Sequence, residues 1–250
     1  MFPEIVRIGG VVIYSYGLML AAAIVVCSVL LSKDAKRALG IEQDAVLDLV
    51  FWTMIAGILG ARLFYILLNL PFFIENPQEI IMLQHGGLAF QGGLVLGALC
   101  AAWIIRRKGW PFWKMTDLIA PYLALGHAIG RIGCFLNGCC YGRPADWGIY
   151  FPVHEAHLHP TQVYDTVLLT AVFFILKKFQ KSGLKDGGTF ALYLVFASAE
   201  RVAVEFFRAD HEILLFGLSI FQYVSIVIFL GGAALWFYLK GNNGSKHLHH

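Results

Sequence analysis

Charged residues are scarce in this sequence. Asp, Glu, Lys and Arg make up 14% of its 250 residues, whereas hydrophobic residues make up 58% and the mean hydropathy is +0.69. A soluble domain of this length carries far more charge, so the composition excludes that class and indicates a membrane protein. The formal net charge of +3 is also too small to indicate binding to nucleic acid.

Cysteines are few, and their spacing argues against two common kinds of cysteine site. The five cysteines do not form a disulfide framework, and no C-x-x-C motif is present. Cys27 and Cys100 lie in apolar runs, which is typical of small core residues. Internal repeats, low-complexity linkers and a soluble domain are also lacking. The sequence therefore predicts one integral membrane domain over residues 1–240 and a disordered polar tail over 241–250.

Long apolar runs, by contrast, occur along the whole chain. A membrane span needs about 20 mostly apolar residues. Seven ranges meet this requirement, and we expect each to be a helix of an all-α, polytopic membrane protein. They are 11–32, 46–70, 87–106, 116–137, 161–179, 188–207 and 215–239.

Lys and Arg collect in alternate loops between these ranges. They cluster after the first, third, fifth and seventh ranges, whereas the opposite loops hold only Arg143 and Arg208. Because cytoplasmic loops are enriched in Lys and Arg, this pattern predicts an N-terminus outside the cell and a cytoplasmic C-terminus. An odd number of spans predicts the same placement of the termini on opposite sides.

The fourth range ends in a stretch that is unusually polar for a membrane span. Residues 126–143 read GHAIGRIGCFLNGCCYGR. Dense glycines break or bend a helix, and buried polar groups are costly unless they have partners. Irregular backbone at membrane depth survives only inside protein or beside a wet cavity. We therefore expect a broken helix that forms the floor of a polar intramembrane cavity.

Three of the cysteines, Cys134, Cys139 and Cys140, lie in this stretch. One hypothesis is that they bind a metal together with histidines of the following loop, although adjacent cysteines do not match the usual zinc spacing. A second is that they are redox-active, although the C-x-x-C motif is lacking. A third is that they are small polarizable residues that line a binding site. We favour the third hypothesis.

Polar side chains are also predicted at membrane depth in the first three ranges. Tyr16 precedes Gly17 in the first range, which is typical of a cavity wall. Arg62 lies inside an apolar run, where its charge indicates a lipid headgroup, a carboxylate partner or a snorkel to the interface. Gln91 lies between two pairs of glycines, and this arrangement suggests backbone amides that are free to bind an anion.

Charged residues occur in the fourth, fifth and sixth ranges. His127 and Arg131 are four residues apart and share one helical face. Arg is suited to phosphate because its guanidinium binds two oxygens at once, although helix-end carbonyls are an alternative partner. Asp165, at the start of the fifth range, is expected to pair with an arginine of the fourth or sixth range.

The sixth range ends in a charged stripe. Arg201, Glu205 and Arg208 follow the spacing i, i+4, i+7, which places them on one face of an otherwise apolar helix. An Arg–Glu pair inside a span must face the interior of the bundle. Glu205 is therefore either a structural partner of Arg201 or a catalytic group.

Taken in order, six motifs of this chain resemble the prolipoprotein diacylglyceryl transferase family. The similarity covers nearly the whole chain, and several ordered motifs with matching spacing do not arise from hydropathy alone. The motifs are YGLM at 16–19, ARLFY at 61–65, GGLAFQGGL at 86–94, GRIGCFLNGCCYGR at 130–143, HPTQVYD at 159–165 and RVAVEFFR at 201–208.

The resemblance implies a seven-span enzyme of the bacterial cytoplasmic (inner) membrane that uses phosphatidylglycerol. Such an enzyme transfers the diacylglyceryl group to the lipobox cysteine in the signal peptide of a prolipoprotein and releases glycerol 1-phosphate. This is the first step of lipoprotein maturation. The positions that match the family's functional residues are Tyr16, Arg131, Asn137, Gly142, Arg201 and Glu205.

Four positions depart from the family's pattern. Cys134 stands where the family has Asn, Cys139 where it usually has Glu, Gln91 where it often has His or Tyr, and Ala197 where a Tyr is expected. These departures leave open an alternative function, in which a divergent paralogue handles thiol redox chemistry or metal ions through Cys134, Cys139 and Cys140.

The resemblance and the charged residues together predict a mechanism that needs neither a metal nor an organic cofactor. Arg131 and Arg201 would bind the phosphate, and Glu205 would orient Arg201. Headgroup contacts would come from Tyr16, Arg62, Gln91, Arg131, Cys134, Asn137 and Gly142. The proton acceptor is open between a Cys139 thiolate, His127 and a headgroup oxygen.

Overall fold

The computed structural model describes residues 1–9, 11–82, 85–209 and 215–241, and these residues are predominantly helical. The all-α prediction is therefore confirmed. The long helices are α1 (Ser15–Leu39), α2 (Gln43–Leu68), α4 (Phe90–Arg107), α5 (Phe112–Asn137), α6 (Thr161–Gln180), α7 (Gly188–Glu205) and α8 (Ile220–Gly241). Short helical segments are α3 (Leu70–Glu75), η1 (Pro77–Ile80) and η3 (Leu215–Gly217). The predicted polar tail lies outside the described residues from 242 onward.

Small antiparallel hairpins accompany the helices, and the sequence analysis did not predict them. Strand β1 (Glu4–Ile8) pairs with β2 (Val11–Tyr14), with Arg7 opposite Val12. Strand β3 (Pro144–Phe151) pairs with β4 (Ala156–Leu158), with Tyr150 opposite His157. The first hairpin occupies residues that we assigned to the start of the first span, so helix α1 begins only at Ser15.

Four of the described helices, α1, α2, α5 and α8, are long and apolar enough to cross a membrane. Helices α4, α6 and α7 lie over the third, fifth and sixth predicted ranges and are shorter or more polar. The fourth predicted range ends at the same residue as α5, Asn137.

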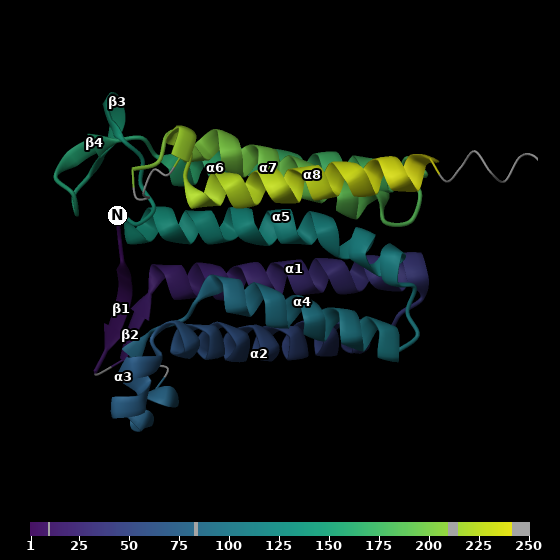
Figure 1. Cartoon of the computed structure of the whole chain (residues 1–250), viewed down its shortest axis with the longest axis horizontal. Helices are drawn as coiled ribbons and strands as arrows, with labels where there is room; N and C mark the ends of the chain where they lie inside the picture. The colour runs from purple at the N-terminus through teal and green to yellow at the C-terminus, as the bar shows by residue number, and fades with distance from the viewer. Residues whose placement is uncertain (10, 83–84, 210–214, 242–250) are drawn as a thin grey trace, which may run out of the picture. The chain divides into compact units, whose positions relative to one another are not determined.

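The chain divides into two compact units, which are described separately. One unit comprises residues 32–115, and the other comprises residues 1–31 together with 116–250. In the first unit, helices α2 and α4 lie side by side (Figure 1). A Cβ atom at Gly60 would lie 2.5 Å from both the Gly92 carbonyl oxygen and the Leu96 Cβ. The glycines therefore allow the two helix backbones to approach closely.

This packing corrects the expectation that the glycine pair after Gln91 offers free amides to an anion. The amides of Gly92 and Gly93 both donate to the Ala89 carbonyl oxygen, at 3.1 and 3.4 Å. Helix α4 has begun at Phe90, so these amides belong to its first turn. Close helix packing, rather than anion binding, explains the glycines.

In the second unit, helix α7 lies between α6 and α8 (Figure 1). A core of Ala124, Val172 and Leu176 packs against partly buried side chains of α6 and α7. Asp117 of α5 binds the start of α7 through hydrogen bonds. Its carboxylate accepts hydrogen bonds from the backbone amides of Gly187 (2.7 Å) and Phe190 (2.8 Å). These donors have no partner within the helix, so Asp117 acts as a cap supplied by another helix.

The expectation of a broken helix within residues 126–143 is wrong. Helix α5 runs without interruption to Asn137, and the chain turns only at Gly138, whose φ is +77°. Two of the glycines instead allow residues of another helix to approach the α5 backbone closely. A Cβ at Gly133 would lie 3.3 Å from the Tyr16 Cα, and one at Gly126 would lie 3.5 Å from the Cys27 Sγ. A helix tolerates such glycines where tight packing offsets their backbone entropy.

Candidate functional site

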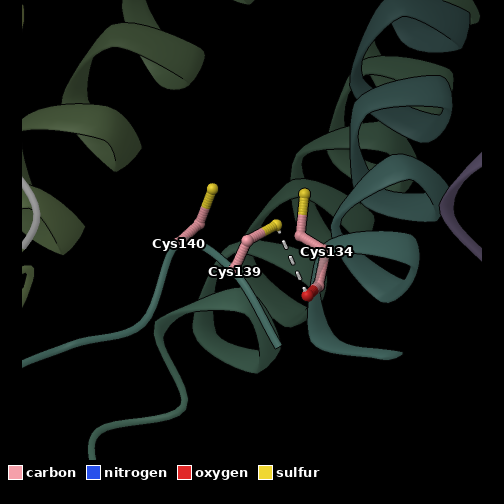
Figure 2. A group of neighbouring side chains, drawn as sticks. All are labelled: Cys134, Cys139 and Cys140. Atoms are coloured by element: carbon pink, nitrogen blue, oxygen red, sulfur yellow. Dashed lines mark hydrogen bonds between the residues drawn. The ribbon is translucent and has the colours of Figure 1, made fainter. Parts of the chain in front are cut away.

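The end of helix α5 brings three thiols together. Cys134 lies in the last turns of α5, and Cys139 and Cys140 lie just beyond its end. The three Sγ atoms are all within 4.8 Å of one another, and all three cysteines are free thiols (Figure 2). The Cys139 thiol also faces the Cys134 carbonyl oxygen at 3.7 Å. The sequence analysis grouped these cysteines, and the structure places them in contact.

The backbone that carries Cys139 and Cys140 is held by two buried side chains of α6. Thr161 Oγ1 donates to the Cys140 carbonyl oxygen at 2.8 Å, and Gln162 Nε2 donates to the Cys139 carbonyl oxygen at 2.6 Å. Both side chains are fully buried. Cys140 itself has a φ of +62°, which is costly for a residue with a Cβ. These contacts stabilise that conformation and fix the direction of the thiols.

The environment favours the thiolate form of Cys140. Hydrogen bonds with the Cys134 and Cys139 thiols, followed by the positive charges of Arg208 and Arg131, lower the pKa of Cys140 below its ordinary value. The arginines of the charged ranges therefore lie within electrostatic range of the three thiols.

Arg131 pairs with Asp165, as the sequence analysis expected of an arginine in the fourth or sixth range. Its Nε lies 2.8 Å from Asp165 Oδ2, and the Asp165 side chain is 1% exposed. The Arg131 side chain keeps 12% of its surface exposed. His127, one turn before Arg131, is exposed.

The charged residues at the end of α7 form a second ion pair, although Arg208 lies beyond the last helical residue, Glu205, and not on the helix as its spacing predicted. Arg201 Nη2 lies 2.8 Å from Glu205 Oε2, and Arg208 Nε lies 3.7 Å from the same oxygen. Ser219 Oγ donates to Glu205 Oε1 at 2.7 Å, so both carboxylate oxygens of this fully buried side chain are engaged. Arg201 Nη1 is buried and makes no hydrogen bond to any described residue. Glu205 thus fixes Arg201 while one edge of the guanidinium remains available.

Three further predicted site residues border these groups. Tyr16 lies against Gly133, the residue before Cys134. The Asn137 side chain hydrogen-bonds to the Cys139 thiol. The Gly142 amide donates to the His159 carbonyl oxygen at 2.9 Å, and a Cβ at Gly142 would lie 2.5 Å from the Phe207 carbonyl oxygen. Gly142 is therefore the point where the loop after α5 approaches the end of α7.

Arg62 and Gln91 belong to the other compact unit. Gln91 is exposed in the first turn of α4. Arg62 is buried, and each of its five N–H groups donates to a backbone carbonyl oxygen. The acceptors are Ile80 (3.2 Å), Gly86 (2.5 Å), Gly87 (3.0 Å), Met82 (3.3 Å) and Glu79. These contacts favour a structural role for Arg62, and binding of a lipid headgroup stays a prediction.

Glu200 was not among the site residues predicted from the sequence. This residue is buried and lies beside Asp165, within electrostatic range of Arg131 and Arg201. Its position directly before Arg201 in an apolar range was the available signal, because an acid at membrane depth needs a partner. Arg131, Arg201 and Arg208 therefore gather with the acids Asp165, Glu200 and Glu205 around the ends of α5 and α7.

Comparison with known families matches almost the whole chain. The family model described as prolipoprotein diacylglyceryl transferase covers residues 3–238. This match includes all the charged groups described above and the three thiols.

Individual relatives agree with the family match. The chain is 35% identical to a protein of Clostridium tetani over 239 residues, which cover 93% of this chain and 95% of the relative. It is 35% identical to proteins of Trichormus variabilis (95% and 90% covered) and Bordetella avium (98% and 96% covered). All three are named phosphatidylglycerol–prolipoprotein diacylglyceryl transferase. The comparisons do not support the alternative of a thiol-redox or metal-handling paralogue.

Proposed function

The chain belongs to the prolipoprotein diacylglyceryl transferase family, and from this premise we propose that it transfers a diacylglyceryl group from phosphatidylglycerol to a prolipoprotein. The acceptor is the lipobox cysteine of the signal peptide, and glycerol 1-phosphate is released. The observation that carries the proposal is the family match over residues 3–238, together with relatives that are matched over at least 90% of their own length.

The enzyme works, in this proposal, as one multi-pass domain of the bacterial inner membrane. Long helices lie over all seven apolar ranges, and four of them are suited to cross a membrane. The clusters of Lys and Arg support an N-terminus outside the cell and a cytoplasmic C-terminus. The charged site would then lie toward the outer side, where α5 ends and α6 begins.

The reaction is a displacement at carbon. The sulfur of the acceptor cysteine attacks the carbon of the diacylglycerol that bears the phosphate ester. An S–C bond forms there while the bond from that carbon to the phosphate oxygen breaks. The thiol proton passes to a base, and the bonding electrons leave with glycerol 1-phosphate. Because the leaving phosphate gains negative charge in the transition state, fixed cationic groups aimed at it lower the barrier.

Arg131 and Arg201 supply these cations. Arg201 presents a buried Nη1 that makes no hydrogen bond to any described residue, which suits a phosphate oxygen. Arg131 meets Asp165 through Nε, and its side chain keeps 12% of its surface exposed. Planar guanidinium groups bind two phosphate oxygens in a fixed geometry, which a lysine does not reproduce.

Glu205 acts as a positioning residue for these arginines. Its carboxylate is fully buried and meets Arg201, Arg208 and Ser219. Removing the carboxylate would leave two buried cations with less compensation, at a cost of about 3–5 kcal/mol. Glu205 therefore sets the direction of Arg201 before the lipid binds.

Polar groups around the thiols complete the headgroup site in the proposal. Tyr16, Cys134 and Asn137 border the end of α5, and Gly142 closes the following loop. A headgroup contact of Gln91, in the unit of residues 32–115, stays a prediction from the resemblance. The candidates for the proton acceptor are Cys139, which lies next to Asn137, His127, which is exposed one turn from Arg131, and an oxygen of the lipid headgroup.

A transfer assay tests this function. Purified protein in phosphatidylglycerol micelles is mixed with a lipobox peptide, and release of glycerol phosphate is measured. We expect release that stops when the cysteine of the peptide is replaced by serine. Release that is independent of the peptide cysteine, or no release from folded protein, would refute the transferase.

Three variants test the roles within the site. Arg131→Lys keeps the charge but not the planar fork, so activity equal to that of the parent would contradict bidentate phosphate binding. Comparing Cys139→Ser with His127→Gln identifies the base, because only loss of the base changes the dependence of kcat on pH.

A further inference from the structure

The three thiols at the end of α5 offer three protein ligands for one metal ion, and a fourth position of a tetrahedral ion would be open to water. We infer that Cys134, Cys139 and Cys140 bind a thiophilic cation, Zn²⁺ or Cu⁺, as a three-thiolate site (Figure 2). The two ions share one chemistry here, because soft thiolate ligands select both of them over Mg²⁺ and Ca²⁺.

The distances suit such a site. A Zn–S bond of about 2.3 Å requires sulfur atoms about 3.8–4.0 Å apart in a tetrahedral or trigonal arrangement. The three Sγ atoms already lie within 4.8 Å of one another. Each sulfur therefore moves by less than about 1 Å, which rotation about one side-chain bond supplies. In Figure 2 the Cys139 side chain extends from the loop toward Cys134 on the helix, and Cys140 lies beside Cys139.

The backbone supports the arrangement independently of the thiols. Cys140 keeps a left-handed conformation at φ +62°, and Gly138 before it has φ +77°. Thr161 and Gln162 hold the carbonyl oxygens of Cys140 and Cys139. The Cys139 amide donates to the Cys134 carbonyl oxygen at 3.2 Å. Two cysteines are thus folded back over the third by buried contacts, as a preorganised metal site requires.

Nearby charge compensates the ligands. Three thiolates around a divalent ion carry a net charge of −1, and around Cu⁺ a net charge of −2. Arg131 lies one turn before Cys134 on α5, and Arg208 pairs with Gly142, two residues after Cys140, so both cations are placed to offset this charge. On binding, each thiol releases its proton to solvent and forms a metal–sulfur bond, so no electron is transferred.

Occupancy has a consequence that rests on the proposed function. The anionic metal–thiolate group would compete with the phosphate for the positive charge of Arg131, the arginine that both would use. A bound thiophilic ion therefore lowers lipid transfer, and the site acts as a metal-sensitive brake on the enzyme.

The first test measures binding without activity. Full-length protein in detergent is dialysed against Zn²⁺, or against Cu⁺ under reducing conditions, and bound metal is counted for the parent, Cys140→Ser and Cys100→Ser. We expect one more ion per chain in the parent and in Cys100→Ser than in Cys140→Ser. The parent and Cys100→Ser should also bind the ion at least tenfold more tightly than Cys140→Ser does. The histidines of the tail are common to all three proteins, so they cancel in the difference. Equal binding in all three would overturn the site.

A second measurement uses the unmodified chain and does not depend on any variant folding. Thiols are labelled with a maleimide with and without Zn²⁺, and the labelled positions are read by mass spectrometry. Protection of Cys134, Cys139 and Cys140, with Cys100 unprotected, is expected. Equal labelling of the three thiols in both conditions would overturn the site.

The consequence for transfer is measured on the same samples. Zn²⁺ should reduce glycerol phosphate release at least tenfold in the parent and in Cys100→Ser, but not in Cys140→Ser. Binding without inhibition would remove the brake and leave the site. Binding by a protein that releases no glycerol phosphate under any condition would refute the transferase instead, so the two failures are distinct.

Discussion

Arginines at two places in this molecule, one buried and the other half-buried, show how the same residue type serves two purposes. Arg62, in the unit of residues 32–115, gives all five of its N–H groups to backbone carbonyl oxygens between Glu79 and Gly87. Arg131 and Arg201, in the other unit, each meet a carboxylate instead.

The difference lies in how many N–H groups of the guanidinium each set of partners leaves without a hydrogen bond. Backbone carbonyls surround Arg62 and satisfy it completely, so the guanidinium holds a loop in place. A carboxylate compensates the charge of Arg201 but engages one edge, and its buried Nη1 makes no hydrogen bond to any described residue. A buried arginine is therefore a binding group only where its hydrogen-bonding capacity is incompletely used. Four predictions test this distinction.

The largest expected effect is that of Arg201→Lys. A lysine keeps the charge near Glu205 but lacks the second nitrogen that meets the phosphate. We expect kcat/KM to fall by about 100-fold to 1,000-fold, the usual result of losing one preorganised transition-state donor. The melting temperature in detergent should change little, because the ion pair with Glu205 persists. A transfer rate within threefold of the parent would show that Arg201 is not a phosphate-binding group and would remove the distinction from Arg62.

Arg62→Lys should have the opposite signature. Lysine has three donors where Arg62 uses five, so at least two carbonyl oxygens lose their partners. At about 1–1.5 kcal/mol for each unsatisfied group, unfolding free energy should drop by about 2–3 kcal/mol. Denaturant unfolding measures this loss. An unchanged unfolding free energy, with transfer reduced as strongly as in Arg201→Lys, would show that Arg62 binds the lipid.

Gly87→Ala and Gly86→Ala sharpen the test of the Arg62 loop. Both glycines have positive φ, +78° and +81°, so alanine strains the backbone similarly at each. At Gly87 the added Cβ would also lie 2.8 Å from Arg62 Nη1 and 2.5 Å from Tyr65, whereas at Gly86 it meets open space. We expect Gly87→Ala to destabilise the protein by about 1–2 kcal/mol more than Gly86→Ala. Equal losses would mean that Arg62 does not depend on this contact.

The smallest expected effect is that of Ser219→Ala. Ser219 donates to the oxygen of Glu205 that does not face Arg201. Its loss removes the hydrogen bond to the buried carboxylate, worth about 1.5 kcal/mol, and the longer one that Ser219 Oγ accepts from the Gln222 amide (3.3 Å). Transfer should fall by about tenfold, because the first of these supports Glu205. Ser225→Ala, a buried serine elsewhere on α8, serves as the matched control in the same transfer assay. An equal fall in both variants would show that Glu205 needs no support from Ser219.

Much of the fold could be predicted from the sequence, because a long run of apolar residues identifies a helix without reference to the rest of the chain. Long helices lie at all seven predicted ranges, and the end of α5 agrees with the predicted residue. The first range was misplaced at its start, since apolar residues at 11–14 suit a strand as well as a helix. The glycines of residues 126–143 were misread as helix breakers, because sequence alone does not show what a glycine packs against.

The sequence by itself determined that buried charges exist and must be compensated. An arginine or an acid within an apolar range is too costly to leave unpartnered, so hydropathy alone singles out Arg62, Arg131, Arg201 and Glu205. Helical spacing also predicted the pair of Arg201 with Glu205, because i and i+4 share one face.

Only the tertiary structure decided which partner each charge takes. Arg131 meets Asp165 on another helix, Arg62 meets carbonyls of a distant loop, and Cys134 meets two thiols beyond the end of its own helix. These partners are separated along the chain, and their distances depend on helix packing and on two residues with positive φ. Local spacing does not contain that information, which is why the chemistry of the site required the fold.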